Sequence, residues 1–225
     1  MEKRSVKEWV KRYAFCALGL FISALGVAFT RIGELGVSQV SSVANVLSIK
    51  FPFLTLGNWL ILWNCLLILL QILILRKNFK IIQLFLQLIV SFLFGYFTDF
   101  GVWLFSAIPV SGESPYVLRI VTVLIGTALV AFGICFNVIA SAVMNAGESF
   151  VRAISDTSHK DFGTLKIIVD VSFVVISVVL SLVFFQGQLI GVREGTVIAA
   201  LLTGFLIKIF VKPLRPGLTK FIEAN

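Results

Sequence analysis

The sequence predicts an all-α fold: a polytopic membrane bundle of about six transmembrane helices, arranged as two inverted three-helix repeats. Three observations predict this fold class. The 225 residues are 59% hydrophobic and 13% charged, whereas roughly a quarter of the residues in a soluble domain are charged. Apolar runs of bilayer-spanning length recur along the whole chain. The chain also matches itself when it is shifted by about 107 residues.

Each apolar run holds roughly 17 to 25 residues, which is enough for a helix to cross the hydrocarbon core. Hydropathy places the six spans at residues 13–30, 57–75, 81–98, 117–141, 167–185 and 195–211. Two segments between them, 37–49 and 146–158, are too short and too polar to span. The expected domains are a basic tail at 1–12, a first repeat at 13–107, a second repeat at 108–212 and a tail at 213–225.

The net charge of +8 is distributed as a topology signal. The lysines and arginines gather between the apolar runs, not along one face of a soluble nucleic-acid-binding element. If the N-terminus is cytoplasmic, fifteen of the 19 lie on that side, and only Arg31, Lys50, Arg119 and Arg193 lie outside. The positive-inside rule therefore predicts a multi-pass protein of the plasma membrane with both termini in the cytoplasm.

Glycines and polar residues recur at equivalent places in the two halves. The equivalent pairs include Gly19 and Gly126, Gly26 and Gly133, Gly57 and Gly163, Asn64 and Asp170, Gly95 and Gly204, and Asp99 and Lys208. Because each repeat holds an odd number of spans, the second repeat enters the membrane from the opposite side. Such inverted repeats are frequent in secondary transporters.

Polar side chains follow one face of several spans at helical spacing. Two explanations remain open. Small polar residues let helices pack closely in lipid, whereas large amides are costly against lipid and suit a cavity lined for a solute. The candidates for binding a cargo are Asn64, Gln71, Gln87, Asn137, Asp170 and Ser177.

Charged residues within spans are rare and usually face a partner or a pathway. Asp170 follows Lys166 by four residues, so it either forms an intrahelical ion pair or serves cargo binding and ion coupling. Asp99 and Lys208 end the third and sixth spans at equivalent positions. Each of these two either extends to the interface or gates a pathway.

Each of the two short segments is expected to form a short helix, capped by Ser38 and by Asn145. Such a helix either folds into the bundle, with its N-terminal amides aimed at an anionic cargo, or lies along the bilayer surface. We favour the surface helix, with Glu148 and Arg152 paired at a spacing of four. Both residues are also candidates for gating or coupling.

The sequence gives no sign of a catalytic or metal centre. The cysteines Cys16, Cys65 and Cys135 lie in different apolar runs without CxxC spacing, and His159 is the single histidine. No HExxH, GxSxG or GxxxxGK[ST] motif is present. We therefore expect no enzyme activity, no cofactor and no metal.

Two stretches carry a family resemblance. The run from Gly26 through RIGELGVSQV to Gly57 in LTLGNW, and the later VREGTVIAALLTGF, resemble the YitT and YczE group of bacterial membrane proteins. The chain departs from that group at Gln39, where a proline is often found, and at Arg193, which replaces the first glycine of a GxGT-like turn. The resemblance implies a multi-pass bacterial membrane protein with transport as a candidate role, and it supplies no substrate.

The sequence favours a small-solute permease or exporter with a central site between the repeats. Two alternatives remain open. One is a membrane-embedded subunit that binds a solute for a larger transport complex, and the other is an accessory membrane protein that moves no solute. The expected partners are the lipid bilayer and an unidentified small molecule, without nucleic acid.

Overall fold

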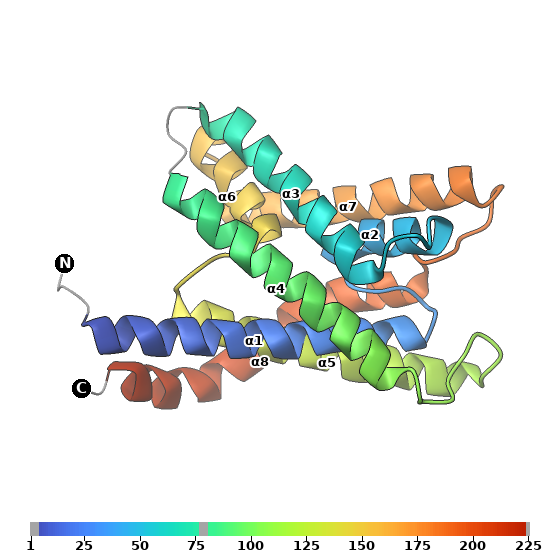
Figure 1. The fold of residues 1–225 in the computed structure, drawn as a ribbon, viewed down its shortest axis with the longest axis horizontal. Coiled ribbons are helices and arrows are strands. Elements are labelled where there is room, and N and C mark those ends of the chain that lie inside the picture. The colour runs from blue at the N-terminus through green and yellow to red at the C-terminus, as the bar shows by residue number, and fades with distance from the viewer. Residues whose placement is uncertain (1–4, 77–80, 224–225) are drawn as a thin grey trace.

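The computed structural model describes residues 5–76 and 81–223, which form eight α-helices (Figure 1). Their bounds are α1 Val6–Ile32, α2 Gln39–Lys50, α3 Leu56–Leu75, α4 Ile81–Phe105, α5 Tyr116–Ala140, α6 Ala146–Ser158, α7 Phe162–Phe184 and α8 Glu194–Glu223. Each half of the chain contains a long helix, a short helix and two more long helices, in that order. The short helices are α2 and α6.

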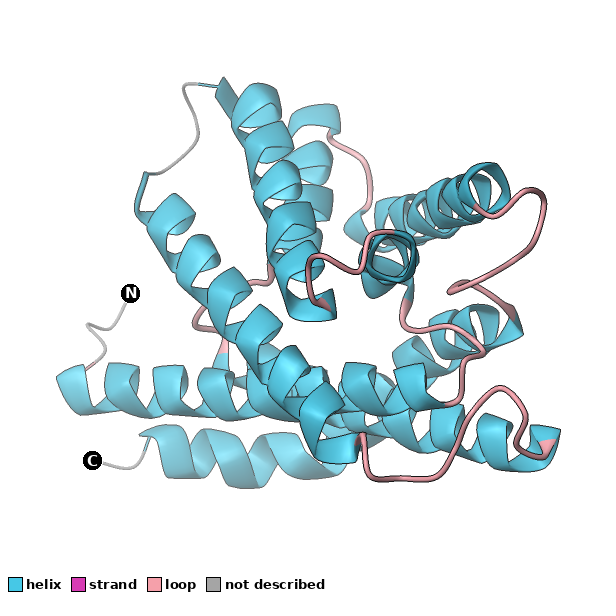
Figure 2. Cartoon of the chain, turned by 45° about the vertical axis from the view of Figure 1, so that its right-hand side comes forward, coloured by secondary structure: helices cyan, strands magenta, loops and turns pink. Residues whose placement is uncertain are grey.

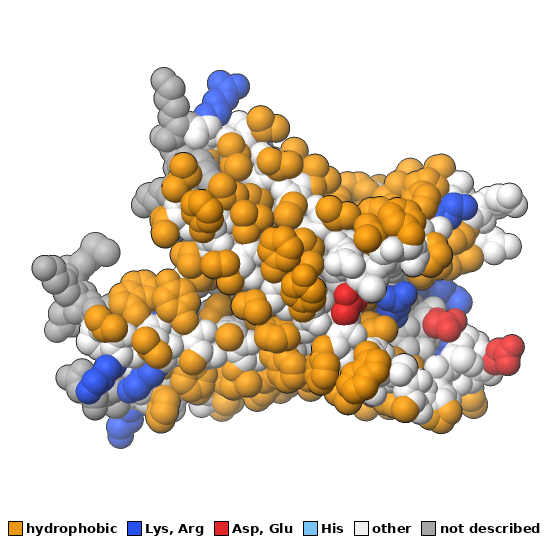
Figure 3. Space-filling view, in the orientation of Figure 1, with side chains coloured by type: hydrophobic (Ala, Val, Ile, Leu, Met, Phe, Trp, Pro, Cys, Tyr) orange, Lys and Arg blue, Asp and Glu red, His pale blue; other side chains and the backbone are white. Residues whose placement is uncertain are grey.

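The six long helices confirm the predicted all-α fold with six membrane spans, because each is long and apolar enough to cross a bilayer. Their outward side chains are largely apolar (Figure 3). Leu73, Ile81, Trp103, Val183 and Leu201 are each at least 67% exposed. So much exposed apolar surface suits lipid rather than water, and the protein is therefore a multi-pass membrane protein.

The first and last helices of the chain extend beyond the predicted spans. α1 begins at Val6, where the Ser5 hydroxyl caps the first turn, and α8 continues to Glu223 through two prolines. Residues 6–12 and 213–223, which belong to the expected tails, therefore continue these two helices. Hydropathy did not detect these turns because they contain many charged residues.

α1 and α5 form the most extensive contact between helices. They run antiparallel, with Gly19 against Gly133 and Gly26 against Gly126. A Cβ atom at any of these glycines would lie under 3.0 Å from backbone atoms of the other helix. Small residues therefore permit this close approach. α4 packs on α1 and α8 packs on α5.

An arginine near the start of each of these two helices binds the end of the other. Arg12 Nη1 donates a hydrogen bond to the Ala140 carbonyl at the end of α5 (2.8 Å). Arg119 Nε donates to the Gly33 carbonyl just after α1 (2.8 Å). Both arginines are buried. Their positive charges are favourable there because the C-terminal end of a helix carries partial negative charge.

The helices divide into two groups by their contacts. α1, α4, α5 and α8 form one group, which we call the long-helix group. α2, α3, α6 and α7 form the other, which we call the short-helix group because it contains both short helices. Figure 1 shows the short-helix group in its upper half. One hydrophobic cluster joins α3 to the long-helix group, and a second lies within the short-helix group between α3, α6 and α7.

α2 is buried between α3 and α7 (Figure 2). Eight of its 12 residues are buried, so the favoured surface helix is wrong for this segment. A polar helix tolerates burial here because its serines bond within the helix, as when Ser42 Oγ donates to the Gln39 carbonyl (2.7 Å). α6 is amphipathic, as expected, with Val151 buried and Arg152 exposed.

Details of the short helices differ from the prediction. Ser38 and Asn145 occupy the N-cap positions of α2 and α6, but neither side chain accepts a capping hydrogen bond in the described chain. Among the described residues, Arg152 forms its ion pair with Asp156 (3.4 Å) instead of with Glu148. The predicted pairing on the face of α6 is therefore wrong.

Candidate functional site

A cavity of about 540 Å³ opens between the two helix groups, at the end of the bundle where α1 begins and α5 ends. The ends of α3 and α5, the start of α4, and α6 line this α6 vestibule. Its polar lining includes Gln71, Gln83, Gln87, Asn137, Glu148 and Arg152. Three predicted cargo residues and two predicted gating residues therefore share one cavity.

The amides of the α6 vestibule differ in how their hydrogen bonds are satisfied. Gln71 Nε2 donates to the Ala146 carbonyl (3.1 Å) and ties α3 to the start of α6. Gln87 Oε1 and Asn137 Oδ1 are buried and accept no hydrogen bond within the described part of the chain. Buried polar atoms normally have a partner. Because both residues line the cavity, their oxygens are acceptors for a donor that enters it.

A cluster of charged and polar side chains joins α7 to both short helices. Lys166 Nζ lies 2.5 and 2.6 Å from the Asp170 carboxylate oxygens, so the intrahelical ion pair, one of the two alternatives for Asp170, is present. Gln39 Nε2 of α2 donates to Asp170 Oδ2 (3.3 Å). Burial raises the pKa of Glu148 on α6, the Lys166 charge opposes this rise, and the Asp170 charge adds to it. We call these four residues the central cluster.

A second cavity, of about 610 Å³, opens at the opposite end of the bundle. The ends of α1 and α4, α2, and the loop before α8 line this α2 vestibule, whose polar residues include Arg31, Glu34, Asn45 and Arg193. Asn45 Nδ2 donates to the Gly191 carbonyl (2.7 Å). Its buried Oδ1 accepts no hydrogen bond from the residues described, so this vestibule also presents an acceptor without a partner.

The two vestibules are lined at corresponding positions of the two halves. A shift of 107 residues moves five lining residues of the α2 vestibule onto lining residues of the α6 vestibule. These are Arg31 onto Val138, Glu34 onto Ser141, Gly36 onto Val143, Asn45 onto Arg152, and Ile49 onto Asp156. The side chains differ, so the two openings share these shifted sequence positions but not a charge pattern.

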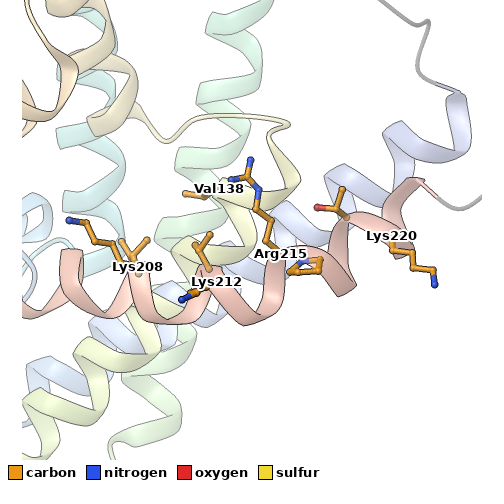
Figure 4. Close-up of a pocket in the computed structure, with 9 residues that line it drawn as sticks. Val138, Lys208, Lys212, Arg215 and Lys220 are labelled. Carbon is orange, nitrogen blue, oxygen red and sulfur yellow. The ribbon is translucent and has the colours of Figure 1, made fainter.

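A third cavity, of about 970 Å³, lies in a groove between α5 and the last turns of α8 (Figure 4). Lys208, Lys212, Arg215 and Lys220 stand along this α8 groove. Figure 4 shows Lys208 and Arg215 extending from the side of α8 that faces Val138, and Lys212 and Lys220 extending from the opposite side. Val138 also lines the α6 vestibule, so the groove and the vestibule adjoin there.

The remaining predicted residues lie outside both vestibules. Asn64 is 4% exposed and Ser177 is fully buried. Ser177 Oγ donates to the Val174 carbonyl of its own helix (2.8 Å), which indicates a packing role. Asp99 binds the start of α3, and Lys208 lies in the α8 groove. The structure therefore does not bring Asp99 and Lys208 to the central cluster.

Sequence reasoning missed Gln39 as a site residue. It appeared only as a departure from an expected proline, yet its amide is the link from α2 to Asp170. A proline has no side-chain donor, so this departure was a usable signal.

Within residues 5–76 and 81–223, no three histidine, cysteine, aspartate or glutamate side chains are grouped so that they could hold a metal ion.

The fold defines a class: an all-helical, multi-pass membrane protein with polar cavities at both ends of its bundle. Residues 10–212 match the model of the family described as "Family of unknown function (DUF6198)", and the chain belongs to this family. It is 24% identical over 200 residues to the "Uncharacterized protein YyaS" of Bacillus subtilis (strain 168), covering 89% of this chain and 92% of that relative. No solved structure matches the chain. The resemblance to the YitT and YczE group stays a prediction.

Proposed function

We propose that the protein is a small-solute permease or exporter that works by alternating access, with the central cluster as its binding site. The observation that carries this proposal is the pair of vestibules at opposite ends of the bundle, lined at equivalent positions of the two halves. A solute that enters by one vestibule and leaves by the other crosses the membrane without a continuous pore. The site then lies between repeats, as in other secondary transporters.

An inverted repeat is part of this proposal, and the arginine contacts support it. A shift of 107 residues moves Arg12 onto Arg119 and Gly33 onto Ala140. The bond from Arg12 to Ala140 thereby becomes the bond from Arg119 to Gly33. The glycine contacts between α1 and α5 behave in the same way. Contacts that map onto themselves when the halves are exchanged are those expected around a twofold axis in the membrane plane.

The helix neighbours also support the repeat. The contact of α4 with α1 corresponds to that of α8 with α5, and the contact of α2 with α7 corresponds to that of α6 with α3. Two contacts between the two groups break the correspondence in the described chain. The larger is that α3 packs on α4 whereas α7 has no comparable packing on α8, and the smaller is that α2 contacts α8 whereas α6 has no comparable contact with α4. A transporter held in one of two states has this kind of asymmetry.

The central cluster has chemistry suited to a polar solute and to a proton. Asp170 and Lys166 offer both signs of charge, and Gln39 adds an amide. Because the pKa of Glu148 is raised, this group holds a proton at a higher pH than an ordinary glutamate. The sequence has no nucleotide-binding motif, so we propose an ion gradient as the energy source.

Solute exchange by the purified protein tests the function. Liposomes that contain the protein are loaded with a bacterial metabolite extract, and counterflow is followed by mass spectrometry. Exchange by the chain alone supports a permease. Binding without exchange supports the solute-binding subunit. The absence of both binding and exchange supports an accessory protein.

Asp170→Asn tests the site. We expect it to abolish binding or exchange while the protein still inserts in the membrane, because the variant loses the charge that Lys166 and Gln39 contact. Ser172→Ala is the matched control, since Ser172 is exposed on the same helix and its hydroxyl donates to the Ile168 carbonyl of its own helix. Normal exchange by the Asp170→Asn protein would remove Asp170 from the site.

A further inference from the structure

α3 and α4 form a closed seam between the two helix groups, near the end with the α2 vestibule. Gly57 and Gly95 approach so closely that a Cβ at either would lie under 3.0 Å from the other's carbonyl oxygen. Asp99 of α4 binds the start of α3, with Oδ1 accepting from the Gly57 amide (2.7 Å) and Oδ2 from the Thr55 hydroxyl (2.6 Å). A carboxylate is favourable at this position, because the N-terminal end of a helix carries partial positive charge.

The equivalent seam between α7 and α8 is open. Within the described chain, no atom outside its own helix lies within 4 Å of the position where a Cβ of Gly204 would stand. A Cβ at Gly163 would meet only the Asp161 carboxylate at that range. Lys208 is exposed in the α8 groove (Figure 4). α3 and α4 are therefore packed together, whereas α7 and α8 are not packed at the equivalent positions.

The residues of the open seam match those of the closed seam with donor and acceptor exchanged. Shifts of 106 and 109 residues move Thr55 onto Asp161 and Asp99 onto Lys208. Asp161 is the N-cap of α7, accepting from the Thr164 amide (2.8 Å), as Thr55 is the N-cap of α3. Where α3 offers donors to a carboxylate on α4, α7 offers a carboxylate to the ammonium group on α8.

We propose a second state in which the two helix groups rock, so that α7 closes on α8 and α3 separates from α4. In this state Lys208 Nζ pairs with the Asp161 carboxylate, and Gly204 packs against Gly163. The inference rests on the proposed function and names the residues that hold its two states. Closure moves α8 toward the α6 vestibule. Release of Asp99 from the start of α3 frees the end of the bundle with the α2 vestibule. Hydrogen bonds from Thr164 lower the pKa of Asp161, so the carboxylate is charged at neutral pH.

Disulfide formation between engineered cysteines reports each seam, in a background where the native cysteines are replaced by alanine. In the closed seam Ile61 packs where a Cβ of Gly95 would stand, so Ile61→Cys with Gly95→Cys probes that seam. Because the added Cβ also lies 2.7 Å from the Gly57 carbonyl oxygen, the effect of Asp99→Ala is compared only between proteins that carry this same cysteine pair. Ile167 is equivalent to Ile61, and Ile167→Cys with Gly204→Cys reports the second seam. The control pair joins Ile167→Cys to Leu206→Cys, which places the cysteine on the opposite side of α8.

Asp99→Ala removes the carboxylate that holds the closed seam. We expect it to speed disulfide formation at 167–204 about tenfold and to slow it at 61–95, tenfold being the factor for about 1.4 kcal/mol, the size of one net hydrogen bond. Lys208→Gln should slow the formation of the 167–204 disulfide by a similar factor. Lys212→Gln, one turn away and also exposed, should leave it unchanged.

The proposal is overturned if the 167–204 pair reacts no faster than the control pair in both the parent and the Asp99→Ala protein, although maleimide labels every cysteine. The disulfide assay uses no cargo, so it is independent of the exchange assay. If the 167–204 pair fails in this way while the protein still exchanges solute, the proposed second state is rejected and the permease function stands. A 167–204 disulfide that responds to Asp99→Ala and to Lys208→Gln supports the second state, whatever the cargo is.

Discussion

Gly26→Ala tests the most extensive helix contact among the described residues, that of α1 with α5. The new Cβ would lie 2.6 Å from the Val130 amide nitrogen and 2.7 Å from the Gly126 carbonyl oxygen, whereas non-bonded atoms prefer about 3.5 Å or more. Both neighbours are backbone atoms, so α1 and α5 must separate by roughly 0.9 Å. Overpacking costs about 1–3 kcal/mol, and the helix propensity of alanine offsets up to about 1 kcal/mol. Because three atoms of α5 would lie under 3.0 Å from the new Cβ, we place the overpacking cost in the upper half of that range and expect a net loss of about 1–2 kcal/mol.

The loss is measured as the free energy of unfolding from a titration with SDS in mixed micelles. Gly204→Ala is the matched control, because no neighbouring atom of the described chain lies within 4 Å of its Cβ position. It should keep or raise stability, by up to about 1 kcal/mol. Gly133→Ala, at the position equivalent to Gly26, should lose as much as Gly26→Ala. Equal stability of Gly26→Ala and the parent would refute the reasoning.

Three further predictions concern hydrogen bonds and the Glu148 carboxyl group, whose pKa is raised. Arg12→Met and Arg119→Met should each lower the free energy of unfolding by about 1–3 kcal/mol, because each removes a charged donor from carbonyls at a helix end; unequal losses would argue against equivalent roles. Burial raises the pKa of Glu148 above 4.5, so the parent should lose stability as pH rises through that raised value. Glu148→Gln should therefore match the parent below about pH 4.5 and exceed it near pH 8 in thermal melts; parallel curves would contradict this. Ser181→Ala should cost about 1–2 kcal/mol, since Ser181 Oγ accepts from the Ile190 amide (2.7 Å); an unchanged Tm would contradict it.

The six spans were predictable from sequence because the bilayer imposes a length on every apolar helix. The ends were not, because helix turns outside the hydrocarbon core are stabilised by contacts that hydropathy does not register. At the start of α1, Ser5 Oγ accepts from the Glu8 amide (3.1 Å), and Glu8 in turn pairs with Arg12 (2.8 Å). These local bonds extend the helix through residues whose charges end the hydropathy signal.

Part of the candidate site was predictable for a similar reason. Gln71, Gln87 and Asn137 carry amides that are costly against lipid, and all three line the α6 vestibule. Ser177 gave the same signal from sequence, but a hydroxyl can bond to its own helix, as this one does. Hydroxyls at helical spacing therefore say less about a cavity than amides do.

The burial of α2 was not predictable from its composition. Ser42 and Ser48 suggest a wet surface, yet each hydroxyl bonds to a carbonyl of its own helix, at 2.7 and 2.8 Å. Asn45 and Gln39 extend to other elements, at Gly191 and Asp170. Which of these partners a polar helix finds depends on tertiary packing, which single-residue polarity does not encode.

The division into two helix groups leads to a last prediction. Contacts within each group are largely matched between the halves, and the clear exception lies between the groups, at the α3–α4 seam. Exchanging the halves therefore leaves each group nearly unchanged and alters how the groups meet, which describes the rocking of two rigid bodies. Spin labels at Leu18 and Val138, both exposed and both in the long-helix group, should keep one distance in the parent and Asp99→Ala proteins. Labels at 167 and 204, which lie in different groups, should move closer. A change in the first distance would show that the long-helix group itself deforms, and that the α1–α5 contact is not the fixed part of the motion.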